Sequence, residues 1–198
     1  MLNKLLSHVA PQRENETHSY SGLKVLELGC GAGDPVTLRL AAHSAIGSII
    51  ANDISSTMLT MLHSNLTQAG EEAESKIEAA EGDMMALDIG TGTLDAVIAY
   101  YSIIHLEQLD QLKMIALISK WLKPNTGHLL CCFASQESLG NLNEDWLGMR
   151  AFWSSHGAEG SIKMVEEAGL EVVLSETIHE HGDAEFLWVI ARKLKTKG

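Results

Sequence analysis

The sequence predicts an α/β protein built on a doubly wound, mostly parallel seven-stranded sheet with helices on both faces. Segment 94–99 alternates little between polar and apolar residues, which is typical of a strand that helices cover on both sides. The last two strand segments have only a short turn between them, so we expect the last strand to be antiparallel. Helical patterns separate most of the seven strand segments, which are 25–28, 48–51, 76–80, 94–99, 128–134, 170–178 and 185–191.

Length and composition indicate one ordinary globular domain over residues 1–198. Apolar residues make up 45% and charged residues 20% of the chain, and no apolar run approaches the length of a membrane span. The net charge of −12 argues against nucleic-acid binding, because phosphate contacts need a clustered basic face. The three cysteines make no disulfide framework and residues 1–10 lack a secretory signal. We therefore expect a cytoplasmic protein without a nucleic-acid or membrane partner.

The first 22 residues are expected to form a short helix and a linker. An apolar stripe from Leu2 to Val9 lies on one helical face, and Pro11 ends the pattern. The residues that follow, up to Gly22, are polar and loop-like.

The first strand runs directly into a glycine-rich turn. Glycine stands at positions 29, 31 and 33, where it allows backbone angles that other residues avoid and lets a ligand lie on the bare backbone. Asp34 is a natural N-cap and Pro35 a natural first residue of the helix that follows. The stretch therefore predicts a strand, a ligand-binding turn and a helix.

The acidic residues of this turn favour a cation over a phosphate. A dinucleotide fingerprint requires Gly or Ala at the position of Asp34, where a carboxylate would face the pyrophosphate. Glu27 adds a second carboxylate on the preceding strand. Asp53 follows the second strand and can accept both hydroxyls of a ribose. A positively charged ligand with a ribose and no phosphate is S-adenosylmethionine.

With these motifs the chain resembles the class I S-adenosylmethionine-dependent methyltransferases over about residues 23–193. The resemblance implies a Rossmann-like fold, S-adenosylmethionine as cofactor and S-adenosylhomocysteine as product. It also implies that Asp83 contacts the adenine amine and that Met84 covers the ring, although a solvated acid beside a half-buried methionine is the alternative. The predicted cofactor-binding residues are Glu27, Gly29, Cys30, Gly31, Gly33, Asp53, Ile54, Met58, Asp83, Met84 and Tyr100.

The candidate catalytic residues follow the fourth strand, because ligands of open α/β sheets collect at carboxyl ends. Histidine is the usual general base near neutral pH, so His105 is the first candidate base for a hydroxyl, thiol or amine. The alternative is a helix-start histidine bonded to the backbone. Tyr101 is a second candidate, with ordinary packing as its alternative, and His156 is a weaker candidate base. The Asn-Pro-Pro-Tyr motif of base methyltransferases is absent.

Residues 134–157 are expected to form an irregular loop that makes the wall of the substrate pocket. Long loops inside compact domains are usually functional or disordered, and Trp146 and Trp153 argue for order. Such an aromatic wall favours an apolar or aromatic acceptor, although the tryptophans could instead anchor the loop. The turn His179-Glu180-His181 is predicted to be a solvated hairpin, and we expect no metal site.

Three helices are placed by their apolar spacing. Ser55 caps a helix whose Met58 and Met61 are expected to face the core. A last helix is expected over 159–168. The helix 107–122 is expected to turn four residues inward, namely Leu109, Leu112, Ile115 and Leu122.

The sequence thus predicts methyl transfer from S-adenosylmethionine to the O, N or S atom of a small molecule, by a monomer or homodimer. One alternative is a protein of the same fold that binds the cofactor without methylating, as a scaffold or cyclisation catalyst. An NAD-dependent oxidoreductase is another. Relatives usually carry an N-terminal lid helix that this chain begins too late to contain in full, so we expect a truncated lid or one from another chain.

Overall fold

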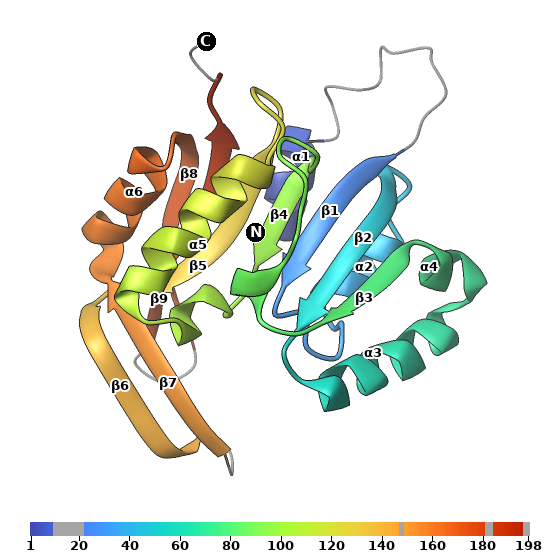
Figure 1. Ribbon diagram of the computed structural model, residues 1–198, viewed down its shortest axis with the longest axis horizontal. Helices are drawn as coiled ribbons and strands as arrows, with labels where there is room; N and C mark the ends of the chain where they lie inside the picture. The colour runs from blue at the N-terminus through green and yellow to red at the C-terminus, as the bar shows by residue number, and fades with distance from the viewer. Residues whose placement is uncertain (10–21, 147–148, 181–183, 196–198) are drawn as a thin grey trace.

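A computed structural model describes residues 1–9, 22–146, 149–180 and 184–195 and confirms the predicted sheet (Figure 1). The strand order is β3-β2-β1-β4-β5-β9-β8. Strands β1 to β5 pair in parallel, whereas β9 runs antiparallel to both β5 and β8. The strands are β1 Leu23–Leu28, β2 Ile46–Asp53, β3 Ile77–Glu81, β4 Ala96–Ala99, β5 His128–Ala134, β8 Leu170–His179 and β9 Glu185–Lys193.

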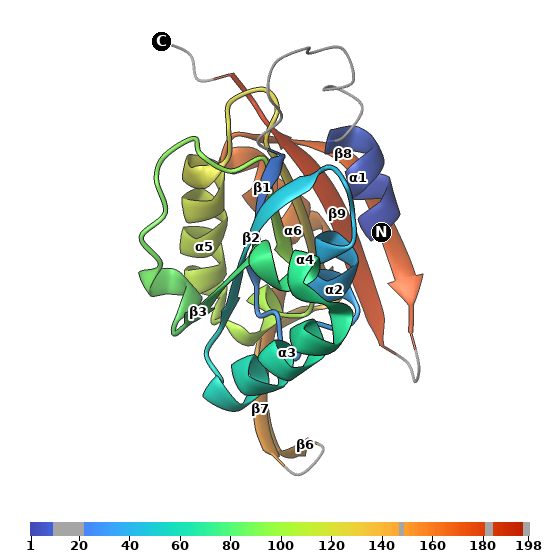
Figure 2. The same cartoon turned by 90° about the vertical axis from the view of Figure 1, so that its right-hand side faces the viewer.

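Helices cover both faces of the sheet (Figures 1 and 2). On one face, α5 and α6 bury Met114, Ile118 and Val165 against the sheet. On the other, α1 and α2 bury Leu5 and Leu40. The helices are α1 Leu2–Val9, α2 Val36–Ala41, α3 Ser56–Ala69, α4 Glu71–Ser75, α5 Gln108–Trp121 and α6 Gly157–Glu167, with 3₁₀ turns η2 Met84–Ala86 and η3 Ile103–His105.

The strand β4 is buried at all four positions, as its lack of alternation predicted. The hydrophobic cores on the two faces of the sheet both include residues of β4. The carboxyl end of β4 is therefore held firmly in the middle of the sheet. No helix in the described part of the chain has the length and apolar character that crossing a bilayer requires.

Several predictions about the helices were wrong, either in the residue that begins the helix or in the side chains that face the core. Helix α2 begins at Val36 with Pro35 at the N-cap position, so Asp34 lies one residue too early to cap it. Leu109 and Leu112 are 69% and 39% exposed, because α5 packs through the stripe that contains Gln111, Met114 and Ile118 instead. In α3, Met61 is also exposed, because Leu62 and Leu66 occupy the buried face.

The segment 134–157 is not an irregular loop. It contains two strands, β6 Glu137–Trp146 and β7 Met149–His156, which pair antiparallel as a ribbon separate from the main sheet (Figure 1). Gly140 and the nearby asparagines look like loop signals in the sequence. In the ribbon, however, the Phe152 ring lies over Gly140, where any Cβ would come within 2.7 Å of it. The glycine therefore makes room for a cross-strand aromatic ring.

Candidate functional site

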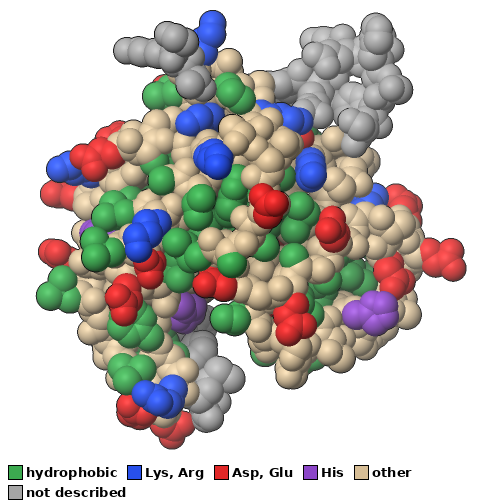
Figure 3. All heavy atoms as spheres, in the orientation of Figure 1, with side chains coloured by type: hydrophobic (Ala, Val, Ile, Leu, Met, Phe, Trp, Pro, Cys, Tyr) green, Lys and Arg blue, Asp and Glu red, His purple; other side chains and the backbone are tan. Residues whose placement is uncertain are grey.

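The carboxyl ends of the parallel strands meet at one edge of the sheet, where open α/β folds bind their ligands. The glycine turn, the loop after β2 and the segment after β4 all lie at this edge (Figure 1). Figure 3 shows the surface hollowed here, with the β6–β7 ribbon on one side and α3 on the other. This carboxyl edge is the candidate site.

The glycine turn has the predicted left-handed backbone, with φ of +69° at Gly29, +56° at Gly31 and +88° at Gly33. A Cβ at Gly31 would meet no atom within 4 Å, so this residue offers bare backbone to open space. At Gly29 a Cβ would instead come within 2.6 Å of the Ser102 side chain. The turn is therefore open to a ligand at Gly31 and packed against the end of β4 at Gly29.

Asp53 connects the glycine turn to the start of α3. Its Oδ2 accepts the N–H of Gly31 at 2.8 Å, and its Oδ1 accepts the N–H of Ser55 at 2.9 Å. Each carboxylate oxygen keeps further lone pairs for a ligand hydroxyl. The neighbouring Ile54 is 76% exposed, which is unusual for a large apolar side chain and places an apolar surface beside the carboxylate.

Glu27 lies behind the glycine turn and is 2% exposed. Burial raises the pKa of its carboxyl to about 8 and the charge of Asp53 adds to the rise, against a lowering by the hydrogen bond from Thr37. The Thr37 hydroxyl donates to Glu27 at 2.5 Å. A cation bound at the turn would favour the ionised carboxylate. Burial raises the pKa of the Cys30 thiol to about 12, so this side chain adds no negative charge to the turn.

The third loop of the edge carries Asp83 and Met84. Asp83 caps η2 by accepting the N–H of Met85 at 2.8 Å, and Met84 is half-buried. Asn52, which the sequence analysis missed, is buried and donates from its side chain to the carbonyls of Ala80 and Gly82. Its amide holds the ends of β2 and β3 together, so the loops of Asp53 and Asp83 lie side by side. Met58 lies in the first turn of α3, where its N–H donates to Ser55 Oγ at 3.3 Å, so Ser55 caps the helix as predicted.

His105 lies where the ribbon meets the carboxyl edge. Its Nδ1 is 2.8 Å from the Phe152 carbonyl, and its ring centroid is 6.0 Å from that of Trp153. Because a carbonyl only accepts, Nδ1 carries the proton and Nε2 keeps a free lone pair. The alternative that His105 is bonded to the backbone therefore holds for Nδ1, while Nε2 can still act as a base. The side chain of Trp146 lies outside the described residues.

His156 and two glutamines fasten the ribbon to α5. The His156 Nε2 is 3.0 Å from the Gln108 carbonyl, so this nitrogen is a donor. The Gln108 amide donates to the Ser155 carbonyl at 2.8 Å, and the buried Gln111 amide donates to the Ser154 carbonyl at 2.9 Å. These contacts indicate an anchoring role for His156. Both glutamines were missed, because glutamines on a helix carry no motif.

Tyr100 and Tyr101 turn toward the face of the sheet that α1 covers. The Tyr100 ring lies edge-on to Trp188 at 4.5 Å, and its hydroxyl is bonded to the Leu2 backbone. Tyr101 packs edge-on against Phe186, as its packing alternative predicted, and its hydroxyl donates to the Glu180 carboxylate. Burial and then Glu180 raise the pKa of the Tyr101 phenol.

The hairpin between β8 and β9 carries no described metal site. His179 pairs with Glu185 at 2.9 Å across the two strands, and His181 lies outside the described residues. Within the described ranges, no group of three or more His, Cys, Asp or Glu side chains could hold a metal ion. Glu180 is not a solvated turn residue, however, because it accepts from Tyr101 and is half-buried.

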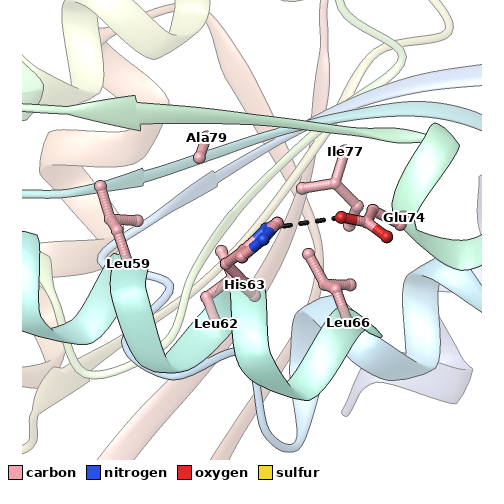
Figure 4. A pocket seen from close by; sticks show the side chains of 7 residues that line it. All are labelled: Leu59, Leu62, His63, Leu66, Glu74, Ile77 and Ala79. Atoms are coloured by element: carbon pink, nitrogen blue, oxygen red, sulfur yellow. Dashed lines mark ion pairs between the residues drawn. The ribbon is translucent and has the colours of Figure 1, made fainter. Parts of the chain in front are cut away.

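A cavity of about 130 Å³ lies between α3, α4 and β3 (Figure 4). Leucines of α3 point toward Ile77 and Ala79, and His63 meets Glu74 at 3.4 Å at the side of the cavity. Leu62 lines this cavity and also touches the glycine turn, because a Cβ at Gly33 would lie 2.5 Å from it. The cavity thus lies behind the glycine turn.

Comparison with known proteins gives one family and several relatives. Residues 25–125 match the family model of the methyltransferase domain. The chain is 32% identical over 119 residues to a demethylmenaquinone methyltransferase of Lactococcus lactis and 29% identical over 140 residues to one of Lactiplantibacillus plantarum. These matches cover 60% and 70% of this chain but 45% and 56% of the relatives. The chain thus spans about half the length of the curated relatives it matches.

Solved structures share the fold at low sequence identity. The [4+2]-cyclase SpnF has a TM-score of 0.73 at 18% identity, over 98% of this chain and 80% of its own. An S-adenosylmethionine-dependent methyltransferase from Methanosarcina mazei also has a TM-score of 0.73, at 14% identity over 94% and 98%. The glycopeptide N-methyltransferase MtfA, solved with S-adenosylmethionine, has a TM-score of 0.65 at 17% identity over 96% and 93%.

Proposed function

The chain belongs to the methyltransferase-domain family, and we propose that it transfers a methyl group from S-adenosylmethionine to a small-molecule acceptor. The observation that carries the proposal is the glycine turn. Gly31 presents bare backbone to open space, while Asp53 holds its N–H and the buried Glu27 lies behind it. A net charge of −12 supports a small molecule over a nucleic acid as the acceptor.

The residues of the carboxyl edge fit this cofactor. A ligand can take the space that a Cβ at Gly31 would fill, and the Asp53 oxygens can accept ribose hydroxyls. The exposed Ile54 and half-buried Met84 offer apolar cover for adenine, and Asp83 offers a carboxylate oxygen for its amine. Glu27 would ionise beside a cation, which compensates part of its burial cost.

In the proposed mechanism the protein mainly positions and deprotonates the acceptor. When bound, S-adenosylmethionine supplies a methyl group on a positively charged sulfur, which is already a good leaving arrangement. The Phe152 carbonyl holds His105 Nδ1, so that Nε2 can accept the proton of an acceptor hydroxyl, thiol or amine. The rest of the acceleration comes from holding the two reactants together.

The acceptor is proposed to have an apolar or aromatic body. The ribbon beside His105 exposes Leu139 and Leu142, and Trp153 stands next to the histidine. The two bacterial relatives are named for demethylmenaquinone, which supports a small organic acceptor. Tyr101 and His156 are secondary candidates for a role in catalysis. Tyr101 would act through its phenol, and His156 would act indirectly by anchoring the ribbon.

Binding of S-adenosylhomocysteine tests the proposal, with Gly31→Ala as the key variant. The new Cβ would enter the ligand's space, so we expect affinity to fall at least about tenfold by calorimetry. Gly92→Ala is the matched control, because Gly92 has the same left-handed backbone (φ +66°) in the turn before β4, and a Cβ there touches only Pro124. Equal losses in both variants, or a thermal shift with NAD and none with S-adenosylhomocysteine, would contradict the proposal.

Transfer of labelled methyl from S-adenosylmethionine to a pool of metabolites tests the reaction itself. A mass shift in an acceptor supports methyl transfer. Binding without any transfer would instead support the non-methylating alternative, in which the same cofactor serves as a scaffold or in a cyclisation.

A further inference from the structure

Tyr101 and Glu180 form a side-chain pair at the carboxyl edge, and the proposed function gives no role to Glu180. Tyr101 follows β4 and Glu180 follows β8, and the Tyr101 hydroxyl donates to the Glu180 carboxylate. Strands β5 and β9 lie between β4 and β8 in the sheet order. The pair therefore connects two distant parts of the chain at the edge where ligands bind, and both residues remain partly exposed.

The backbone of Tyr101 is strained. Its φ of +48° lies in the left-handed region, which bulky residues rarely adopt. Its N–H donates to Cys132 Sγ at 3.2 Å, and its ring lies edge-on to Phe186 at 5.1 Å and to Trp188 at 5.4 Å. These contacts hold the phenol in place. Strained backbone of this kind is concentrated at ligand-binding and catalytic sites.

Ser102 links this pair to the glycine turn. It is 6% exposed, and its hydroxyl has no hydrogen-bond partner among the described residues. Serine at the N-cap of a helix normally caps it, yet Ser102 makes no cap bond to η3. Its side chain lies against Gly29 instead. A ligand that reaches from the glycine turn to Tyr101 would supply the missing partner after a small rotation of the hydroxyl.

We propose that Tyr101, Ser102 and Glu180 form the acceptor subsite, and that the subsite binds an amine on an apolar or aromatic body. This inference rests on the proposed methyltransferase function and names its acceptor class. The Glu180 carboxylate can accept N–H bonds from an ammonium group, and the rings of Tyr101 and Phe186 attract cations. The net charge of −12 favours the approach of a cation over that of an anion.

An ammonium group has no free lone pair, so it must lose a proton before it can be methylated. In the proposed subsite this first N–H proton passes to the Glu180 carboxylate, and His105 Nε2 remains the base for the proton that the neutral amine gives up on methylation. The amine is left neutral with its lone pair free, and Glu180 is left as the neutral acid. The charge of the pair is zero before and after this transfer.

Binding of matched probes to the protein saturated with S-adenosylhomocysteine tests the subsite. The probes are phenethylamine and 2-phenylethanol, which share one body and differ in the cationic group. We expect the amine to bind at least about tenfold more tightly than the alcohol. Glu180→Gln should abolish this preference, while the affinity for S-adenosylhomocysteine stays unchanged. Tyr101→Phe, which removes the hydroxyl that orients Glu180, should reduce the preference by a smaller factor.

Glu176→Gln is the matched control, because Glu176 lies on β8, the strand that Glu180 follows, and pairs with Lys4 at the surface. This variant should keep the full preference for the amine. If the amine binds no better than the alcohol, or if Glu180→Gln keeps the preference, the inference is overturned even though S-adenosylhomocysteine binds. A protein that binds no S-adenosylhomocysteine would instead overturn the proposed function.

Discussion

The two halves of the carboxyl edge are built in different ways. On the side of the proposed cofactor site, a hydrogen bond joins the backbone N–H of Gly31 to Asp53, which is 22 residues away. On the acceptor side, His105 reaches Phe152 over 47 residues and Tyr101 reaches Glu180 over 79. The proposed cofactor site is therefore built on local backbone geometry, whereas the proposed acceptor site is built on side chains that only the folded sheet brings together.

The largest expected effect concerns the buried carboxyl of the cofactor side. Burial raises the Glu27 pKa from 4.5 to about 8, so the folded protein binds a proton that the unfolded chain has already released between these pH values. Stability is therefore highest below pH 4.5 as far as this group is concerned, and it falls as the pH rises toward 8. We expect a loss of about 5 kcal/mol in the free energy of unfolding across this window.

Glu27→Gln should remove most of this pH dependence, because the amide does not ionise. Urea unfolding of both proteins between pH 5 and 9 measures the difference. Equal slopes of stability against pH would show that Glu27 is not held neutral by burial. A bound cation at the glycine turn should reduce the difference, so S-adenosylmethionine, whose sulfur is positively charged, can be added to sharpen the comparison, with the uncharged sulfur of S-adenosylhomocysteine as the control.

The next effect concerns the acceptor side. His105→Ala should lower turnover by about 100-fold or more, since a positioned base contributes that much, with little change in affinity for S-adenosylhomocysteine. Steady-state kinetics and calorimetry measure the two quantities separately. His63→Ala, an exposed histidine on α3, is the control that should leave turnover unchanged. Full activity of the His105 variant would make this histidine a structural residue of the ribbon.

Asp53→Ala should weaken S-adenosylhomocysteine binding by about 1–3 kcal/mol, because it leaves ribose hydroxyls unpaired and frees the Gly31 N–H. Asp53→Asn keeps an oxygen for that N–H and should lose less. Calorimetry of the three proteins gives the comparison. An affinity that does not respond to either change would exclude Asp53 from the cofactor site.

The smallest effect concerns the ribbon surface. Leu139 is 83% exposed, so Leu139→Gln should change the free energy of unfolding by less than about 0.5 kcal/mol. If the ribbon is the acceptor wall, KM for an apolar acceptor should rise while kcat holds. Thermal unfolding and steady-state kinetics test both statements. An unchanged KM would remove this part of the ribbon from the acceptor site.

The sequence alone determined the sheet and the glycine turn. Seven strand segments were placed correctly. The central strands β4 and β5 are buried and read as continuous apolar runs, whereas β8 at the sheet edge alternates along its length. The glycine turn was predicted because glycine adopts, without steric cost, the left-handed backbone that the structure has at positions 29, 31 and 33. The match of residues 25–125 to the methyltransferase-domain family confirms the family that the sequence motifs indicated.

Only the tertiary structure decided the acceptor side. The ribbon was missed because Gly140 owes its place to the Phe152 ring, a contact that no local pattern records. Glu180 looked like a solvated turn acid until the fold set Tyr101 against it. A special backbone conformation requires particular residue types at neighbouring positions, so it can be recognised in the sequence. A contact between side chains that are distant in the sequence has no such local pattern, because it forms only when the sheet packs.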